Sequence, residues 1–225
     1  YHNRGKRLYC LKLDVRKFYP SIDHDELKKV IRRKIKDYRL LKLLDEIIDS
    51  TDGVPIGNYL SQFFANIFLS ELDHSIKEDF HMKYYYRYAD DIVIISENKN
   101  MLFLLLDYIK KSLKLLKLEV KKNWQVFPIS SNKYDRHGRG IDFLGYVFYM
   151  NCIYLRKRIK YNFMKKALKL HNKQVTCDDF IKLKAAWYGW CKHANTRHLY
   201  NKIIKISNNG KSIKQQYSFY NRKCG

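Results

Sequence analysis

Two adjacent aspartates, Asp90 and Asp91, separate two runs of apolar and aromatic residues, 84–88 and 92–95. Runs of this length and composition are typical of β-strands, and the short polar link between them predicts a β-hairpin. An acid pair alone is most often a solvated turn, but strands this apolar belong to a buried sheet. Carboxylates clustered there repel one another unless a cation binds them. The hairpin therefore constrains both the fold and the chemistry.

A third aspartate, Asp14, ends a stretch in which Leu11, Leu13 and Val15 alternate with Lys12. A period of two predicts a half-buried strand with Asp14 on its polar face, near the strand end. Three carboxylates on neighbouring strands offer the hard oxygen ligands that Mg²⁺ prefers. Joining a nucleotide to a growing strand depends on such ions, and this set could supply their ligands.

The rest of the chain alternates between helical periodicity and short strands. Thr176 and Asp179 have the spacing of a capping box, and the stripe behind them, with Trp187 and Trp190, is interpreted as core. The predicted helices cover residues 25–48, 61–80 and 101–116 and much of the segment beyond 156. Strands are predicted within 118–127 and 141–149. A turn loop is expected at 52–58 and a polar loop at 130–140.

The chain is strongly basic, with 45 Lys and Arg against 22 Asp and Glu and a net charge of +23. Residues 151–225 hold 18 Lys and Arg against two Asp. This excess favours a polyanionic partner, and nucleic acid is the first candidate. The 19 Tyr, 12 Phe and 3 Trp could stack on unpaired bases, although core packing is the commoner role of an aromatic side chain.

The five cysteines are scattered without the spacing of a zinc site, so we interpret them as reduced thiols. No apolar run reaches the length of a membrane span, and the first residues lack a secretory hydrophobic region. We therefore expect a cytoplasmic setting and no membrane partner.

Three segments, in order along the chain, resemble motifs A, B and C of reverse transcriptases. They are residues 13–22 around Asp14, residues 53–62, and Tyr88-Ala89-Asp90-Asp91. Residues 118–122 are similar to the family's lysine-bearing motif, and residues 143–146 are similar to its primer grip. Residues 185–195 are similar to its thumb.

The resemblance implies an α+β fold: the palm of a right-hand polymerase, an antiparallel sheet with helices, followed by a helical thumb. Residues 1–155 would form the palm with a remnant of the fingers, and residues 156–225 the basic thumb. The fingers of this family supply basic residues ahead of motif A, and few residues precede Asp14 here. Fingers are therefore expected to be largely absent from this chain.

The resemblance also implies the roles of individual residues in an RNA-directed DNA polymerase with two Mg²⁺ ions, for which Mn²⁺ can substitute. Lys121 and Lys122 compete for the role of general acid, and Lys122 is favoured. The implied residues are Asp14, Asp90, Asp91 and Lys122 for catalysis; Asp14, Val15, Asp90 and Asp91 for metal; Tyr19, Ile56, Gly57, Asn58 and Gln62 for the nucleotide; and Phe143, Leu144 and Gly145 for the primer grip.

Motif B is the most informative segment for subtype. This segment resembles motif B of the reverse transcriptases of diversity-generating retroelements, through Ile56, Gly57 and Asn58 with Ser61 and Gln62. Those enzymes copy a template repeat RNA with errors at adenines. An apolar side chain beside the incoming base would remove a polar contact and relax pairing. Implied partners are an RNA template, a DNA primer, deoxynucleotides and a basic accessory protein.

Other interpretations remain open at the level of sequence. The chain could be a retron, intron-derived or phage-defence polymerase, or a catalytically silent RNA-binding scaffold, because fold alone does not establish chemistry. A basic protein that binds DNA through one helix leaves the acid hairpin unexplained. Three converging acids argue against the silent scaffold.

Overall fold

The computed structural model describes residues 7–54, 59–172, 177–199 and 201. Internal contacts divide the chain into two compact units: residues 1–129 with 137–139, and residues 130–136 with 140–225. The sequence analysis placed the limit between palm and thumb at residues 155 and 156, which lies inside the second unit. The functional division into palm and thumb stays a prediction.

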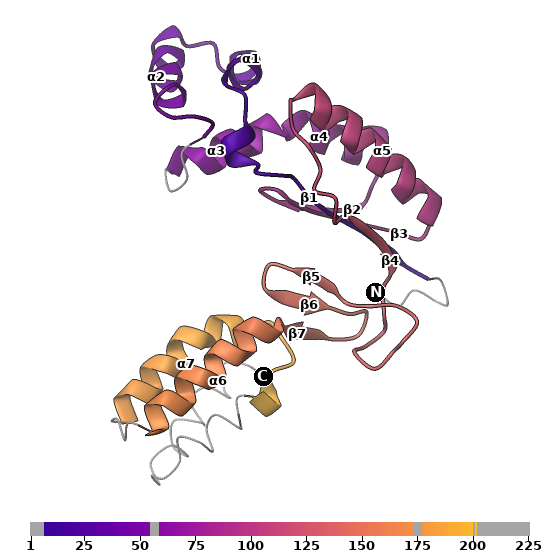
Figure 1. Cartoon of the computed structure of the whole chain (residues 1–225), viewed down its shortest axis with the longest axis vertical. Helices are drawn as coiled ribbons and strands as arrows, with labels where there is room; N and C mark the ends of the chain where they lie inside the picture. The colour runs from indigo at the N-terminus through magenta and orange to yellow at the C-terminus, as the bar shows by residue number, and fades with distance from the viewer. Residues whose placement is uncertain (1–6, 55–58, 173–176, 200, 202–225) are drawn as a thin grey trace. The chain divides into compact units, whose positions relative to one another are not determined.

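A four-stranded antiparallel sheet organises the first unit (Figure 1). Its strands follow the order β2-β3-β1-β4, so the hairpin of β2 and β3 lies beside β1. This confirms the predicted hairpin and the predicted first strand. The strands are β1 (Tyr9–Asp14), β2 (Tyr84–Tyr88), β3 (Asp91–Ser96) and β4 (Gln125–Pro128).

Helices pack on one face of this sheet, as Figure 1 shows for α4 and α5. Leu11 and Leu13 of β1 pair with Ile94 and Ile92 of β3, and all four side chains lie in the core beneath the helices. Because side chains alternate along a strand, Asp14 and Asp91 lie on the opposite face. The helices are α1 (His24–Lys34), α2 (Tyr38–Ile48), α3 (Tyr59–Phe68), α4 (Ser70–His74) and α5 (Lys99–Leu115), and a π turn η2 (Ser75–Asp79) follows α4.

The prediction of one helix over residues 25–48 is wrong. Ile35 leaves α1 in an extended conformation, with φ −110° and ψ 131°. Asp37 then caps α2, because its carboxylate accepts a hydrogen bond from Leu40 N at 2.8 Å. The predicted helix over residues 61–80 is also divided, since Leu69 interrupts it between α3 and α4.

The second unit has a separate sheet and a separate core. Phe163 of α6 is fully buried and stacks on the half-buried Trp187 of α7, with ring centroids 4.7 Å apart. Trp187 therefore packs against this core as predicted, whereas Trp190, at 39% exposed, does not belong to it. Thr176, half of the predicted capping box, lies outside the described residues. The elements are β5 (Ile141–Phe143), β6 (Tyr146–Phe148), β7 (Ile153–Leu155), α6 (Lys157–Asn172) and α7 (Cys177–Cys191).

Two expectations about the whole chain are tested by the described residues alone. Cys10, Cys152 and Cys191 carry free thiols, as predicted. No helix in the described ranges combines the length and the apolar character needed to cross a membrane.

Candidate active site

The three predicted aspartates lie at the same end of the first sheet. Asp14 ends β1 and Asp91 begins β3, and the antiparallel register pairs them directly, so their side chains share a face. Asp90 precedes Asp91 in the hairpin turn, after Ala89. Val15 N donates a hydrogen bond to Asp90 O at 3.1 Å, which joins this turn to the end of β1.

The carboxyl groups of Asp14 and Asp90 are close enough to interact strongly. Burial, and then the negative charge of Asp14, raise the pKa of Asp90 above its usual range. A hydrogen bond between the two side chains contributes to the same shift in pKa. Paired carboxyl groups of this kind are stabilised by a shared proton or by a bound cation. The end of the sheet is therefore a place where a cation is favoured.

Lys121 brings a positive charge to these acids. Its Nζ lies 2.6 Å from Asp14 Oδ1, and its backbone N donates to Asp14 O at 2.8 Å. The hydrogen bond to Asp14 raises the pKa of Lys121, so the side chain remains an ammonium group. Lys122, which the sequence analysis favoured, is exposed, and the structure brings its neighbour to Asp14 instead. Lys12 Nζ lies 3.6 Å from Asp91 Oδ2.

The residues at this end of the sheet fit the predicted metal ions through two carboxylates rather than three. Among the described residues, no three His, Cys, Asp or Glu side chains converge as a preformed metal site requires. Mg²⁺ commonly binds through one or two carboxylates and takes its other ligands from water and substrate phosphates. Asp14 and Asp90 supply such a pair, and burial together with the charge of Asp14 raises the pKa of Asp90.

Tyr19 lies beside the same acids. It begins a short 3₁₀ turn, Tyr19–Ser21, in the segment that follows β1. Burial raises the pKa of its hydroxyl group, and the negative charge of Asp90 raises it further. The hydroxyl therefore stays protonated near the carboxylates. Of the predicted nucleotide-binding residues, this one is brought to the aspartates.

The loop that leads into motif B is attached to the backbone of Tyr19. Val54 N donates to Tyr19 O at 3.0 Å. Gly53 has φ +66°, and a Cβ there would lie 2.6 Å from Tyr19 O. Only glycine fits this close approach in this conformation. The backbone of motif A thus sets where the motif B loop begins.

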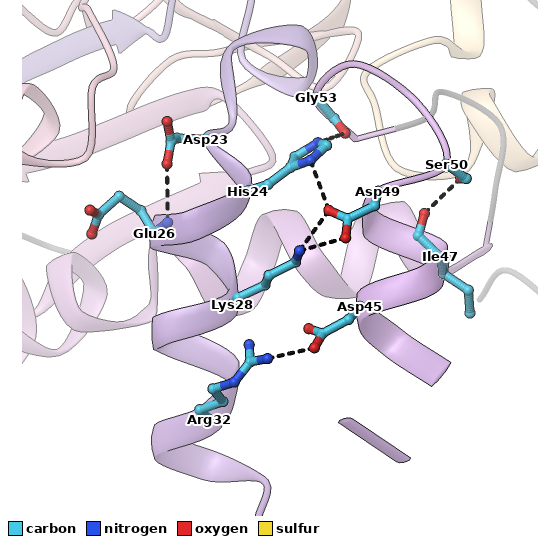
Figure 2. A network of polar contacts seen from close by, with 10 residues as sticks. All are labelled: Asp23, His24, Glu26, Lys28, Arg32, Asp45, Ile47, Asp49, Ser50 and Gly53. Atoms are coloured by element: carbon cyan, nitrogen blue, oxygen red, sulfur yellow. Dashed lines mark hydrogen bonds and ion pairs between the residues drawn. The ribbon is translucent and has the colours of Figure 1, made fainter. Parts of the chain in front are cut away.

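A polar network ties the same loop to two helices (Figure 2). His24 Nε2 of α1 lies 2.8 Å from Gly53 O, and His24 Nδ1 lies 3.3 Å from Asp49 Oδ1 at the end of α2. Lys28 Nζ lies 2.6 Å from the same carboxylate. The imidazole and the carboxylate therefore hold the start of the loop against the pair of helices.

The other predicted motif B residues are placed only in part. Ile56, Gly57 and Asn58 lie outside the described residues, so their roles stay predictions. In α3, Ser61 is buried and Gln62 is exposed. A nucleotide contact of Gln62 is likewise untested.

The predicted primer grip forms the turn between β5 and β6 in the second unit. Phe143 ends β5, and Leu144 and Gly145 follow with φ values of 48° and 86°. Positive φ at both positions is the pattern of a tight hairpin turn. A Cβ on Gly145 would lie 2.6 Å from the ring of Trp190, so α7 packs closely on this turn. The role of these residues at a primer stays a prediction.

Sequence reasoning missed Arg87 of β2. Its side chain is 7% exposed, forms an ion pair with Asp73 at 2.5 Å and donates to Ala89 O in the hairpin turn. The available signal was the strand period, which places Arg87 on the same face as the buried Tyr85. A buried arginine needs an acidic partner, and a search for one would have pointed to the acids of the preceding helix.

The family comparison covers the whole of the first unit and the start of the second. Residues 1–148 match the family model described as reverse transcriptase (RNA-dependent DNA polymerase). The Retron Ec73 reverse transcriptase of Escherichia coli is 31% identical over 144 residues, covering 58% of this chain and 46% of that protein. The putative COX1/OXI3 intron 2 protein of Saccharomyces cerevisiae is 30% identical over 87 residues, covering 32% and 10%. The chain thus spans less than half the length of these relatives.

Solved structures show the same fold at low sequence identity. Apo telomerase from Candida tropicalis, truncated from its C-terminal domain, has a TM-score of 0.55 and 18% identity, covering 69% of this chain and 36% of that one. Telomerase from Candida albicans, in complex with a TWJ fragment of telomeric RNA, has a TM-score of 0.53 and 13% identity, covering 90% and 42%. At these identities the likeness shows the fold alone, and it confirms the predicted α+β polymerase class.

Proposed function

The chain belongs to the reverse transcriptase (RNA-dependent DNA polymerase) family, and from that premise we propose that it carries the nucleotidyl-transfer site of an RNA-directed DNA polymerase. The observation that carries the proposal is that Asp14 pairs with Asp91 across the sheet, while a hydrogen bond from Val15 N to Asp90 O holds the turn with Asp90 beside them. A polymerase of this kind needs paired carboxylates where its cations bind.

Asp14 and Asp90 are the proposed ligands of two Mg²⁺ ions, or of Mn²⁺ in their place. Asp91 is the proposed supporting ligand, and Val15 can contribute only through its backbone carbonyl. When bound, such ions lower the pKa of the attacking hydroxyl group and neutralise charge on the leaving pyrophosphate.

Two side chains beside the acids have proposed roles in handling the nucleotide. Lys121 keeps its proton next to Asp14, so we assign to it, in preference to Lys122, the role of general acid toward the pyrophosphate. The Tyr19 ring, close to Asp90, is the proposed barrier to a ribose 2′-hydroxyl group. Ile56, Gly57, Asn58 and Gln62 are proposed to complete the nucleotide pocket.

Template and primer are the proposed partners of the second unit. The turn of Phe143, Leu144 and Gly145 would support the primer end. Helix α6 bears six Lys and Arg and no acid, and the cations are exposed. Binding through lysine and phosphate weakens as salt rises, because counterions are released on binding.

We assign the subtype to the diversity-generating retroelements, with error-prone copying of a template repeat RNA and a basic accessory protein. The residues behind this finer proposal are Ile56, Gly57 and Asn58. A retron-type enzyme is the second candidate, favoured by the 31% identity to the Retron Ec73 reverse transcriptase.

Primer extension on an RNA template, with Mg²⁺ and all four deoxynucleotides, tests the proposal in the intact protein. Asp90→Asn keeps the side-chain volume but removes the charge that a cation needs, so extension should fall by about 100-fold or more. Asp107→Asn, on the exposed face of α5, is the matched control and should extend as the parent does.

The products also distinguish the two subtypes. Errors concentrated opposite template adenines support the retroelement assignment, whereas faithful copying favours the retron type. A parent protein that binds RNA but extends no primer, or an Asp90→Asn variant with the parent's rate, would exclude polymerase chemistry at this site.

A further inference from the structure

Arg87 lies on the far side of the sheet from the paired acids Asp14 and Asp91. Tyr88 pairs with Asp91, and side chains alternate along β2, so Arg87 shares the helix-facing side with the buried Tyr85. The Arg87 side chain is 7% exposed. A guanidinium group buried this deeply is retained only with partners for its charge and its donors.

Asp73 of α4 neutralises the charge of Arg87. Arg87 Nε donates to Asp73 Oδ1 at 2.8 Å, and Nη2 donates to Asp73 Oδ2 at 2.5 Å. These two bonds form a bidentate pair, which fixes the plane of the guanidinium group. Tyr85 Oη also donates to Asp73 Oδ1, at 2.5 Å, and holds the carboxylate in turn.

The remaining donors of Arg87 reach a second helix and the catalytic turn. Nη1 donates to Asn66 Oδ1 of α3 and to Ala89 O, each at 3.2 Å. Nη2 lies 3.4 Å from Asn66 O. One side chain therefore links α3, α4 and the turn that carries Asp90.

The bond to Ala89 O acts on the peptide that precedes Asp90. Ala89 has φ +51°, a left-handed backbone conformation that residues other than glycine rarely adopt. Its carbonyl belongs to the same planar peptide as the amide of Asp90, so holding one orients the other. The next carbonyl, Asp90 O, accepts from Val15 N at 3.1 Å. Both carbonyls that flank the Asp90 Cα are thus held, one by Arg87 and one by β1.

We propose that Arg87, fixed by Asp73, is a positioning residue that sets the direction of the Asp90 carboxylate toward Asp14 and a divalent cation. It acts through the Ala89 peptide and from the helix side of the sheet. The inference rests on the proposed function for the role of Asp90 as a metal ligand.

The test measures Mn²⁺ binding to the intact protein by calorimetry, without primer or nucleotide. Arg87→Lys keeps a positive charge near Asp73, but a compact ammonium group cannot hold Asp73, Asn66 and Ala89 together. Loss of a group that orients a metal ligand typically weakens affinity by about 10- to 100-fold. We expect a shift of about tenfold in the Mn²⁺ dissociation constant, with a cooperative melting transition retained.

A second variant guards against misfolding. Removing Arg87 alone would leave the charge of the half-buried Asp73 carboxylate without a cation, whereas Arg87→Met combined with Asp73→Leu removes both charges. This double variant should fold and should show the same loss of Mn²⁺ affinity. The matched control is Arg32→Lys, since Arg32 pairs with Asp45 at 2.5 Å between α1 and α2 (Figure 2). It should bind Mn²⁺ as the parent does.

Parent-like Mn²⁺ affinity in Arg87→Lys, or an equal loss in Arg32→Lys, would overturn the inference. The inference would also be overturned if Asp90→Asn bound Mn²⁺ with the same affinity as the parent. Primer extension distinguishes a failure of this inference from a failure of the proposed function. If the parent binds Mn²⁺ through Asp90 but extends no primer, the proposed function fails and the positioning role stands. If it extends primer, Arg87→Lys should slow the chemical step at unchanged affinity for template and primer.

Discussion

At the scale of single residues, the backbone holds Asp14 and Asp90 together against their mutual repulsion. Val15 N bonds to Asp90 O, and Lys121 N bonds to Asp14 O, so neither acid can withdraw without breaking a hydrogen bond of the sheet end. The cost appears as the raised pKa of Asp90, which burial and the Asp14 charge cause. A cation offsets this cost, which is why such a pair is suited to binding one.

Tyr19 gives a prediction at this scale. If its ring excludes a ribose 2′-hydroxyl group, Tyr19→Ala should admit ribonucleotides and lower the preference for deoxynucleotides by about 10- to 100-fold. The measurement is the ratio of kcat/KM for dGTP and GTP in single-nucleotide extension. Tyr38→Ala, at an 80% exposed tyrosine of α2, is the control and should keep the parent's ratio. An unchanged ratio in Tyr19→Ala would exclude the barrier role.

At the scale of elements, the segment after β1 and the loop after α2 are built against each other. Tyr19 O accepts from Val54 N, and His24 links Gly53 O to the Asp49 carboxylate. These contacts connect α1, the end of α2 and the start of the motif B loop. The break between α1 and α2 allows this arrangement, because one continuous helix would carry Asp49 away from His24.

Gly53→Ala tests this junction. The added Cβ would lie 2.6 Å from Tyr19 O, and φ +66° is unfavourable for alanine by about 1–2 kcal/mol even without the contact. We expect a lower free energy of unfolding, by at least about 1 kcal/mol, in denaturant titration. Gly189→Ala is the matched control, because nothing lies within 4 Å of its Cβ in α7. That change should stabilise the chain by about 0.5–1 kcal/mol. If Gly53→Ala and Gly189→Ala changed the free energy of unfolding equally, the close packing of Gly53 on Tyr19 would be contradicted.

At the scale of the whole molecule, the chain has two cores with different chemistry around them. The first core joins β1, β3 and the helices α1 to α5, and the second joins β7, α6 and α7. The acids of the candidate active site belong to the first unit, and the acid-free helix α6 belongs to the second. The proposed chemistry and the proposed grip on nucleic acid therefore depend on separately packed parts.

Hydrogen exchange can test the independence of the two cores. Phe163→Ala removes a fully buried ring from the second core and should cost about 3–5 kcal/mol there. Exchange should then accelerate in α6 and α7, while β1 and β3 keep their protection. Phe68→Ala, in the first core, should give the reverse pattern. If both variants lost protection across both units together, the cores would not be independent.

The sequence by itself determined the first strand, the hairpin and the approach of Asp14 to the acids of that hairpin. Alternation along β1 is a local property of the backbone, so Asp14 could be assigned to the polar face before any partner was known. The hairpin of β2 and β3 was equally readable, because the apolar runs flank a short turn. A resemblance in three ordered motifs led to the family that the comparison shows.

Only the tertiary structure decided which neighbours these residues have. Lys121 rather than Lys122 reaches Asp14 because an isolated bridge between Val15 and Val120 sets that segment's register. Arg87 finds Asp73 and Asn66 on helices that precede it in the chain. The break at Ile35 is sustained by Asp37 as a cap and by contacts between α1 and α2. Pairings between distant segments depend on packing of the whole unit, and local periodicity does not encode them.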